Sequence, residues 1–592
     1  MTDSPIGHEG LLSPVAVPGE ADTQTLMPQW DRWVYAFLAV GILGRAVRYF
    51  ARFPLWEDEC FVSVNFFRRG YLGLLGPLEY HQVGPYLWLW LQKTAVNLFG
   101  FNELSLRLFA FISSILSLVL FFHLVRRLVA GPARVIAVAF FAVGYPCLRY
   151  AAEAKLYPFD LFTSLLLVVL WVEWLRQPDR RRWLIALVVW TPLAIGLSYA
   201  AVFTAGAVSL LFLWLILRRR LPVGWKAWFL YSGAVASGVA LTYLLTARGQ
   251  IGADQSFQSD AYTLARAFPP FDSIGAFLKW MVLTHTGSLF AHPIGGENGG
   301  SVLTLILCVI GAVVFVRGRA AMTPLLLVTP LALHFVAAAM RRYPYAGHVK
   351  FSMYVAPMIY ILFAAGIAAL LGLDLRKGKT ADFVRNVRIV LVLAAVLGVA
   401  AISRDLLHPY KTKSDQRARA FAQWFWPSAG FHDRAVDIKD DLGHQFSAGT
   451  WRDLSWSAMY LANKYIYGSD TSNRSTAARP VSRSEFRLQA AEDRVNAELQ
   501  TDETSVATVT DGQAAGPGTC RRVLRCVLYR DPTKDFDPPA FDRWLAQMKQ
   551  DHPYLGRDVY PFVRMDKRER RLVTTDYVEI YKFDLSDTRR RE

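Results

Sequence analysis

Long apolar runs alternate with short polar segments over the first two thirds of the chain. Eleven of these runs approach the roughly 20 residues that an α-helix needs to cross a bilayer. They lie near residues 32–50, 104–125, 134–149, 157–175, 183–198, 200–217, 227–246, 301–316, 322–340, 351–373 and 388–404. The pattern predicts a polytopic α-helical membrane protein with about eleven spans, followed by a region of different character.

Two segments at the start of the chain are not typical spans. Residues 85–99, PYLWLWLQKTAVNLF, are apolar but short, and their aromatic side chains suit the headgroup zone of a bilayer. We interpret this segment as an interfacial or re-entrant helix. Residues 1–29 are polar, and no basic segment leads into a short apolar core, so we expect a cytoplasmic tail rather than a cleaved signal peptide.

The last region, residues 405–592, has a soluble composition. It opens with the helical-looking stretch DQRARAFAQWFW and closes with the strand-like runs RRVLRCVLYR and DYVEIYKF, which predict a small mixed α/β domain. Residues 467–482 and 511–518 read as loops, and the triplet at Asn473 fits a glycosylation sequon. Cys520 and Cys526 could form a disulfide if the domain lies outside the cytoplasm.

Composition and charge then set the orientation in the membrane. The chain is 53% hydrophobic with a net charge of +17. Its basic residues gather in five short loops, near residues 126–134, 176–182, 218–226, 317–319 and 376–388, so the charge orients helices and does not indicate a nucleic-acid partner. The positive-inside rule places these loops in the cytoplasm and the loops 51–103, 150–156, 247–300 and 341–350 outside.

This topology predicts three parts. Residues 1–29 form the tail, residues 30–404 the transmembrane domain, and residues 405–592 a domain that an odd number of spans places outside the cytoplasm. We expect a multi-pass protein of the plasma or inner membrane that is surrounded by membrane lipids.

The first outer loop carries an acidic trio in the stretch LWEDECFVSVNFF. Glu57, Asp58 and Glu59 could belong to a solvated loop, which is the usual place for such side chains. The flanking Trp56 and Phe61 favour a partly buried segment instead, where a carboxylate can act as a base.

Three other outer segments add polar groups that each have an ordinary structural explanation. Arg342 and Lys350 could be cations at the ends of spans, and Tyr157 could lie in an interfacial aromatic belt. The full set is His81, Gln82, Glu153, Lys155, Tyr157, Arg342, Tyr345, His348 and Lys350. Carboxylates, cations and aromatic rings on one membrane face suit a site for a lipid with an anionic head and a polar reactant.

The motifs in these segments resemble those of the GT-C superfamily of polytopic glycosyltransferases. The match starts with W-x-D-E at Trp56, H-x-x-x-P-x-L at His81 and S-x-R-L at Ser105. It continues with E-A-K-x-Y at Glu153 and Y-P-x-x-G-H-x-K-x-x-x-Y-x-x-P at Tyr343. The chain is most similar to the branch with protein O-mannosyltransferases and lipid A aminoarabinose transferases.

This resemblance implies transfer of a hexosyl or pentosyl group from a polyprenyl-phosphate donor to an acceptor hydroxyl, with inversion. Asp58 is then the general base, and Glu59 orients it or helps to hold a metal where one is used. Lys155, Arg342, His348 and Lys350 are implied to bind the donor phosphate, with either His348 or Lys350 as the main grip. His81, Gln82, Glu153, Tyr157 and Tyr345 are implied to bind substrate.

Several features stay open at this level. The acceptor could be a glycan, a lipid or a protein, and a divalent cation could assist, although no metal-ligand spacing is present. A lipid flippase or transporter is a competing hypothesis, but such proteins place charged groups within their spans. A non-catalytic cell-envelope binding or assembly protein is another, and it would not need Asp58.

Overall fold

The computed structural model describes residues 27–218, 224–251, 267–293, 296, 299–345, 347–376, 379–429, 435–439, 459, 462–463, 466, 523–530, 538–551, 553–565 and 572–584. The chain divides into two compact units. The first comprises Met1–Phe53, Tyr71–Ala95 and Leu104–Pro409, and the second comprises Pro54–Gly70, Val96–Glu103 and Tyr410–Glu592. The second unit therefore combines the C-terminal region with the acidic stretch after the first span.

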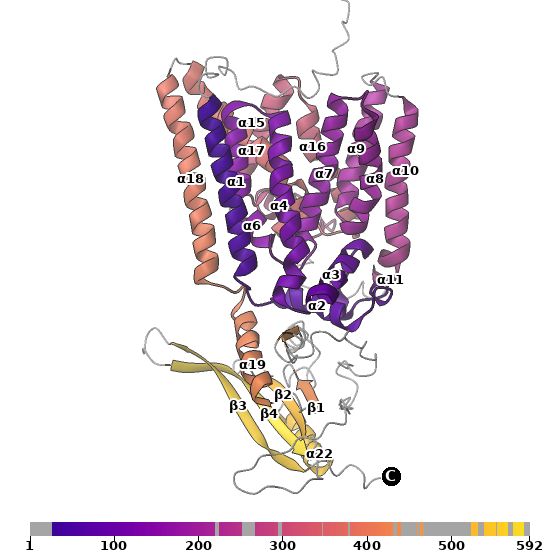
Figure 1. The fold of residues 1–592 in the computed structure, drawn as a ribbon, viewed down its shortest axis with the longest axis vertical. Helices are drawn as coiled ribbons and strands as arrows, with labels where there is room; N and C mark the ends of the chain where they lie inside the picture. Colours follow the sequence, from indigo (N-terminus) through magenta and orange to yellow (C-terminus); the bar gives the residue numbers. More distant parts are fainter. Residues whose placement is uncertain are drawn as a thin grey trace, which may run out of the picture. The chain divides into compact units, whose positions relative to one another are not determined.

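Each of the eleven predicted spans coincides with a helix (Figure 1). These helices are α1 (Met27–Phe50), α4 (Glu103–Leu128), α5 (Gly131–Val143), α7 (Tyr157–Arg176), α8 (Arg181–Leu197), α9 (Ala201–Leu217), α10 (Trp225–Thr242), α15 (Val302–Arg317), α16 (Met322–Ala339), α17 (Ala356–Arg376) and α18 (Thr380–Leu407). Among the described residues, seven helical stretches are long and apolar enough to cross a membrane, and α5, α9 and α15 are shorter apolar helices. The polytopic helical class is confirmed, while the number of crossings stays a prediction.

The third predicted span is not one continuous helix. The chain leaves helical geometry at Gly144 and restarts as α6 (Tyr145–Tyr150), which has Pro146 in its first turn. A Cβ atom at Gly144 would lie 2.0 Å from the Tyr360 hydroxyl, so only glycine fits beside that side chain. Proline is favourable at a helix start because its missing N–H has no partner there.

The predicted outer loops and the adjoining ends of the predicted spans contain further helices. They are α2 (Glu57–Arg68), η3 (Gly73–Leu75), η4 (Glu79–His81), α3 (Tyr86–Phe99), η5 (Tyr243–Ala247), α11 (Arg248–Ile251), α14 (Ile274–His285), η6 (Ser288–Phe290) and η7 (Val349–Val355). The short apolar segment 85–99 does form a helix, α3. The acidic stretch, which the sequence predicts to be partly buried, forms the first turn of α2.

Close approach of helix backbones shapes the core of the first unit. A Cβ atom added at Gly311 of α15 would lie 2.0 Å from the carbonyl oxygen of Leu362. A Cβ atom added at Gly366 of α17 would lie 2.1 Å from the carbonyl oxygen of Leu307. Glycines at these positions let α15 and α17 pack with backbones in contact, as small residues do between membrane helices. Phe121 and Phe141 stack nearby in the same core, with ring centroids 3.9 Å apart.

The second unit contains a four-stranded mixed sheet. Its strands are β1 (Ala435–Lys439), β2 (Val523–Arg530), β3 (Tyr554–Met565) and β4 (Leu572–Asp584), in the order β1-β2-β4-β3. Strand β1 runs parallel to β2, and the other pairs are antiparallel. Pro561 lies in β3, an edge strand, where a missing N–H is tolerated.

In the described part of the C-terminal region, the helices are α19 (Lys413–Ala429) and α22 (Pro538–Asp551). The helical-looking and strand-like stretches of the sequence thus form α19, β2 and β4. Several predicted features lie outside the described residues. They are the predicted cytoplasmic tail up to residue 26, the sequon at Asn473, the predicted loops 467–482 and 511–518, Cys520 and the side chain of Cys526. The disulfide therefore stays a prediction.

Candidate active site

The turn between α5 and α7 carries a group of charged side chains that contact one another or distant elements. Arg48, near the end of α1, forms an ion pair with Asp405 near the end of α18. Its Nε also donates to the backbone oxygen of Arg149 at 2.7 Å. Arg48 therefore ties α6 to the ends of two helices that are far apart in the sequence.

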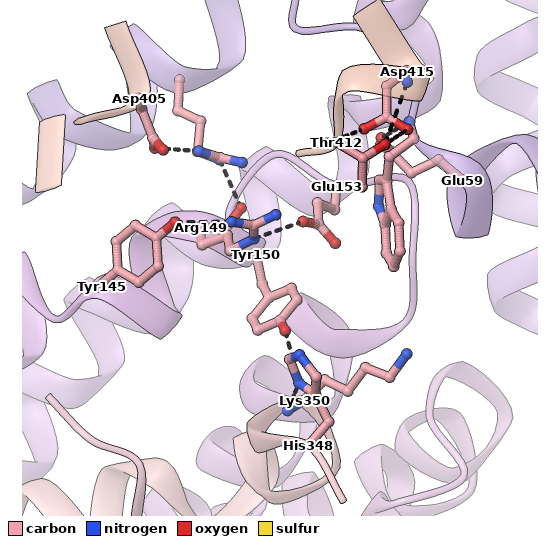
Figure 2. Close-up of polar contacts among 12 residues, drawn as sticks. Glu59, Tyr145, Arg149, Tyr150, Glu153, His348, Lys350, Asp405, Thr412 and Asp415 are labelled. Atoms are coloured by element: carbon pink, nitrogen blue, oxygen red, sulfur yellow. Dashed lines mark hydrogen bonds and ion pairs between the residues drawn. The ribbon is translucent and has the colours of Figure 1, made fainter. Parts of the chain in front are cut away.

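Arg149 of α6 lies between two acceptors, as Figure 2 shows. Its Nη1 donates to the Tyr145 hydroxyl at 2.8 Å, and its Nε lies 3.5 Å from Oε1 of Glu153. Glu153 is only 2% exposed. A buried carboxylate needs such a partner, since an unpaired charge away from water is costly.

Tyr150 connects this turn to a distant segment of the chain (Figure 2). Its hydroxyl lies 3.1 Å from Nδ1 of His348, which begins η7. Burial raises the pKa of Tyr150, and the charge of Glu153 raises it further, so the phenol keeps its proton. The structure thereby brings two of the predicted outer loops together.

The N-cap geometry of η7 determines the tautomer of His348. Its Nδ1 accepts the backbone N–H of Lys350 at 3.2 Å, and a backbone N–H can only donate. Nδ1 is therefore unprotonated, the Tyr150 hydroxyl donates to it, and the ring proton is on Nε2. The imidazole of His348 is neutral in this arrangement.

Two lysines complete the group. Lys155 is 8% exposed and donates from Nζ to Oε1 of Gln82 at 2.7 Å. The Nζ of Lys350 lies 5.4 Å from the centre of the Tyr157 ring, within cation–π range. We call the residues Arg149, Tyr150, Glu153, Lys155, His348 and Lys350 the basic cluster.

Other predicted site residues lie elsewhere or are not described. Tyr345 belongs to an aromatic group, where its hydroxyl lies 3.2 Å from Nε2 of His285 and its ring 4.9 Å from that of His334. Arg342 is exposed. His81 ends η4, and its side chain lies outside the described part of the structure.

His285 and His334 anchor the segment before the basic cluster. His334 donates from Nε2 to the Pro344 carbonyl at 2.8 Å, and its Nδ1 therefore accepts from the Tyr354 hydroxyl at 3.0 Å. His285 donates from Nδ1 to Met281, and burial lowers its pKa. Both rings serve to hold the turn from which His348 and Lys350 follow.

The acidic turn, defined here as Glu57, Asp58 and Glu59, lies in the second unit. It is the first turn of α2, where carboxylates are favoured by the helix dipole. Glu59 is 1% exposed and accepts the backbone N–H of Trp56 at 3.3 Å, so it acts as an N-terminal cap. Glu57 and Asp58 are partly exposed.

The sequence alone did not identify several members of this arrangement. Arg149 and Tyr150 stand just before the E-A-K-x-Y motif, but nothing local marks them as partners of Glu153 and His348. The pairing of Arg48 with Asp405 joins positions 357 residues apart, and no sequence pattern signals it. These contacts depend on how the helices pack.

Comparisons with known proteins bear on the class. Residues 83–245 match the model of a family described as dolichyl-phosphate-mannose-protein mannosyltransferase. No curated protein matches the chain in sequence.

Solved structures similar to the chain include two that are described with a bound polyprenyl or dolichol phosphate. One is ArnT from Cupriavidus metallidurans bound to undecaprenyl phosphate, with 14% identity and a TM-score of 0.48, covering 93% of this chain and 98% of ArnT. The other is the oligosaccharyltransferase AglB from Archaeoglobus fulgidus with an inhibitory peptide and a dolichol-phosphate. It shows 12% identity and a TM-score of 0.45, covering 73% of this chain and 64% of AglB.

The helical fold and the family match over residues 83–245, about a quarter of the chain, are what the class of polytopic membrane glycosyltransferases would show. Within that class, the match over residues 83–245 confirms the resemblance to the GT-C superfamily. The matched region contains the E-A-K-x-Y motif and four of the six residues of the basic cluster.

Proposed function

We propose that the protein transfers a hexosyl or pentosyl group from a polyprenyl-phosphate donor to an acceptor hydroxyl, with inversion, on the extracytoplasmic face of the membrane. The observation that carries the proposal is the basic cluster. Its six residues hold three cations, Arg149, Lys155 and Lys350, and one carboxylate, that of Glu153. A net positive group at the end of a helical bundle suits the phosphate of a membrane-borne donor.

The cluster has the charge that the reaction needs. When the bond between the sugar and the phosphate breaks, negative charge grows on the departing phosphate. Cations held in place before the reaction stabilise that charge without rearrangement. The burial of Lys155 strengthens this effect, because charges interact more strongly away from water.

Lys350, and not His348, is the cation of the late motif in this proposal. The neutral imidazole of His348 is already committed at Nδ1 to Tyr150 and to the backbone of Lys350. Its role is to set the start of η7 and to present Nε2–H as a hydrogen-bond donor. Lys350 then supplies the charge that grips the donor phosphate.

Asp58 is the proposed general base. It takes the proton of the acceptor hydroxyl while the acceptor oxygen attacks the anomeric carbon from the side opposite the phosphate. The bond to the phosphate oxygen breaks, and its electron pair leaves with the polyprenyl phosphate. Glu59 caps α2, so Asp58 and Glu57 are the acids of the turn that stay partly open to a reactant.

The proposed sidedness rests on the first unit. The Arg48–Asp405 ion pair joins the last turns of α1 and α18, so these helices run in the same direction. Two such helices at the start and end of the bundle are what an odd number of crossings requires. If all eleven helices cross, the acidic turn and the C-terminal region follow from the same face of the membrane, outside the cytoplasm.

Metal dependence stays open in this proposal. In the described ranges, no three His, Cys, Asp or Glu side chains gather as a group that could hold a metal ion. No step above is routed through one.

The proposal is tested with the purified, full-length protein. Mass spectrometry of copurifying lipids should find a polyprenyl phosphate or its glycosylated form and so define the sugar. Release of polyprenyl phosphate from the matching synthetic donor then measures transfer whatever the acceptor is. A protein that neither binds nor consumes any polyprenyl-phosphate sugar would contradict the proposal.

A further inference from the structure

Helix α19, the first element of the C-terminal region, starts with a complete capping box. The Thr412 backbone N–H donates to Oδ2 of Asp415 at 2.7 Å, and the Thr412 hydroxyl donates to Oδ1 at 2.8 Å. The Asp415 N–H returns a bond to the Thr412 hydroxyl oxygen at 3.3 Å. Both carboxyl oxygens are thus engaged, and the side chain is locked in one orientation (Figure 2).

Asp415 also begins the buried face of α19. Asp415, Ala418, Phe421 and Ala422 follow helical spacing, and each is at most 2% exposed. Burying a carboxyl group is costly unless it is hydrogen-bonded, and the bonds from Thr412 offset that cost for Asp415.

The start of α2 lies against this turn, within the same unit. The Nζ of Lys411 lies 2.7 Å from the centre of the Trp56 ring, and Trp56 is the N-cap residue of α2. The charge of Glu59 acts on Asp415 and helps to raise its pKa. One helical turn further along α19, Arg419 lies 3.5 Å from Glu103, which belongs to the same unit.

The starts of α2 and α19, about 350 residues apart in the sequence, are therefore in contact. The backbone N–H of Trp56 donates to the Glu59 carboxylate, and the Lys411 ammonium makes a cation–π contact with the Trp56 ring. Asp58 lies between these fixed points, one residue before Glu59. Its orientation thus depends on the C-terminal region as well as on α2 itself.

We propose that Lys411 and Asp415 are positioning residues for Asp58, so that the C-terminal region takes part in sugar transfer by fixing the acidic turn. This inference rests on the proposed function, in which Asp58 is the base. Lys411 holds the N-cap ring from outside, and Asp415 keeps the first turn of α19 folded so that Lys411 is correctly presented. Neither residue touches the reacting atoms.

The expected kinetic signature separates positioning from folding. A small displacement of a catalytic group lowers the rate strongly while leaving substrate binding intact. Lys411→Met, which keeps the length of the side chain but removes its charge, should lower kcat about tenfold or more. The Kd of the synthetic polyprenyl-phosphate sugar should stay within about twofold, because the basic cluster is unchanged.

Conservative and matched variants complete the test. Lys411→Arg should restore most of the rate, since guanidinium also binds aromatic faces. Trp56→Leu should lose as much as Lys411→Met, and the double variant no more than either, if the two act as a pair. Lys549→Met removes a comparable cation from the Tyr554 ring, 4.6 Å away in the same unit, and should leave transfer at the parental level.

Asp58→Asn is measured in parallel to separate the two claims. If Asp58→Asn is inactive while Lys411→Met, Trp56→Leu and Asp415→Asn all retain parental kcat, this inference is wrong and the proposed function stands. If Asp58→Asn keeps parental transfer, the base assignment fails, and the positioning role fails with it. A loss of kcat in Lys549→Met equal to that in Lys411→Met would also overturn the inference, because the effect would then be a general one.

Discussion

The basic cluster draws its residues from two stretches of the chain nearly 200 residues apart, whereas the acidic turn is a single turn of one helix. In the cluster, charged and polar side chains are held by partners from other elements, such as Tyr150 by His348 and Lys155 by Gln82. In the turn, Glu59 is fixed by the helix start itself.

This difference matches two tasks in the proposed reaction. Binding a phosphate benefits from a rigid, preformed group of cations, because nothing has to reorganise when charge develops. A base must meet an acceptor that arrives from water, so a partly exposed carboxylate is more suitable. The contrast predicts that variants of the turn change the rate and leave donor binding intact, while variants of the cluster weaken donor binding and also lower the rate.

The largest expected effect is on the acidic turn. Asp58→Asn keeps the shape of the side chain but removes the base, so kcat should fall about 10²–10⁴-fold. Donor Kd should stay close to the parental value. The measurement is release of polyprenyl phosphate by purified, folded variants.

The neighbouring acids are the controls for this prediction. Glu59→Gln should give an intermediate loss, since glutamine can still cap the helix start. The kcat of Glu57→Gln should stay within about threefold of the parental kcat. An effect of that size is usual for removing a partly exposed charge that makes no contact in the transition state. A ranking in which Glu57→Gln loses most would contradict the assignment of Asp58.

The next effect belongs to the basic cluster. Lys350→Met should weaken binding of the polyprenyl-phosphate sugar about 10- to 100-fold, the usual range for a lost hydrogen bond to a charged group. His348→Asn should lose less, because an asparagine oxygen can accept the backbone N–H that begins η7. Equilibrium binding of a labelled donor distinguishes the two variants. A greater loss of donor affinity in His348→Asn would show that the histidine is the main contact to the phosphate.

A third prediction concerns pH and the start of α19. Burial raises the pKa of Asp415 to about 6, against the lowering effect of the bonds from Thr412, and the charge of Glu59 adds to the rise. Because the pKa of Asp415 is higher in the folded protein than in the unfolded chain, the folded state favours the protonated carboxyl group. The contribution of Asp415 to the free energy of unfolding is therefore complete below pH 3.8 and is lost as pH rises through 6. The shift corresponds to about 3 kcal/mol.

Thermal unfolding of the full-length protein between pH 4 and 7.5 measures this effect. The free energy of unfolding of the parent should fall relative to that of Asp415→Asn as pH rises. The gap between the two free energies should change by up to about 3 kcal/mol over this range. Asp382→Asn, at an exposed surface ion pair with Arg385, is the control and should run parallel to the parent. A constant difference between parent and Asp415→Asn would exclude the titration of Asp415 as the cause.

The smallest expected effect tests the packing beneath the cluster. Gly144→Ala forces a Cβ onto the Tyr360 hydroxyl and should cost about 1–3 kcal/mol of stability, as overpacking does. Displacement of α6 should also weaken donor binding through Arg149 and Tyr150. Gly233→Ala in α10, where nothing lies within 4 Å of the added atom, should be neutral or slightly stabilising. Equal losses in both variants would mean that the close approach at Gly144 is not what matters.

Much of the architecture could be predicted from local pattern. Each apolar run of near-membrane length forms a helix, because an apolar segment in a bilayer must satisfy its backbone hydrogen bonds internally. The strand-like runs in the C-terminal region form β2 and β4 for a similarly local reason, the enrichment of β-branched and aromatic residues. The positions of Asp58, Glu153, Lys155, His348 and Lys350 could also be picked out, because they stand in short motifs.

What the motifs could not show is which of these residues meet. Tyr345 and Lys350 stand five residues apart, yet one packs with His285 and the other lies over Tyr157. The direction of a side chain at a turn depends on the backbone around it. That backbone is held here by distant groups such as His334.

The sequence by itself determined the helical membrane class, the place of the acidic stretch and the two segments that make the basic cluster, since each depends on neighbours in the chain. Only the tertiary structure decided the break at Gly144, the link from Arg48 to Asp405 and Arg149, the neutral state of His348, and the contact of Lys411 with Trp56. These features arise where remote segments come within a few ångströms of each other. Their energies depend on distance and burial, which no local pattern of residues encodes.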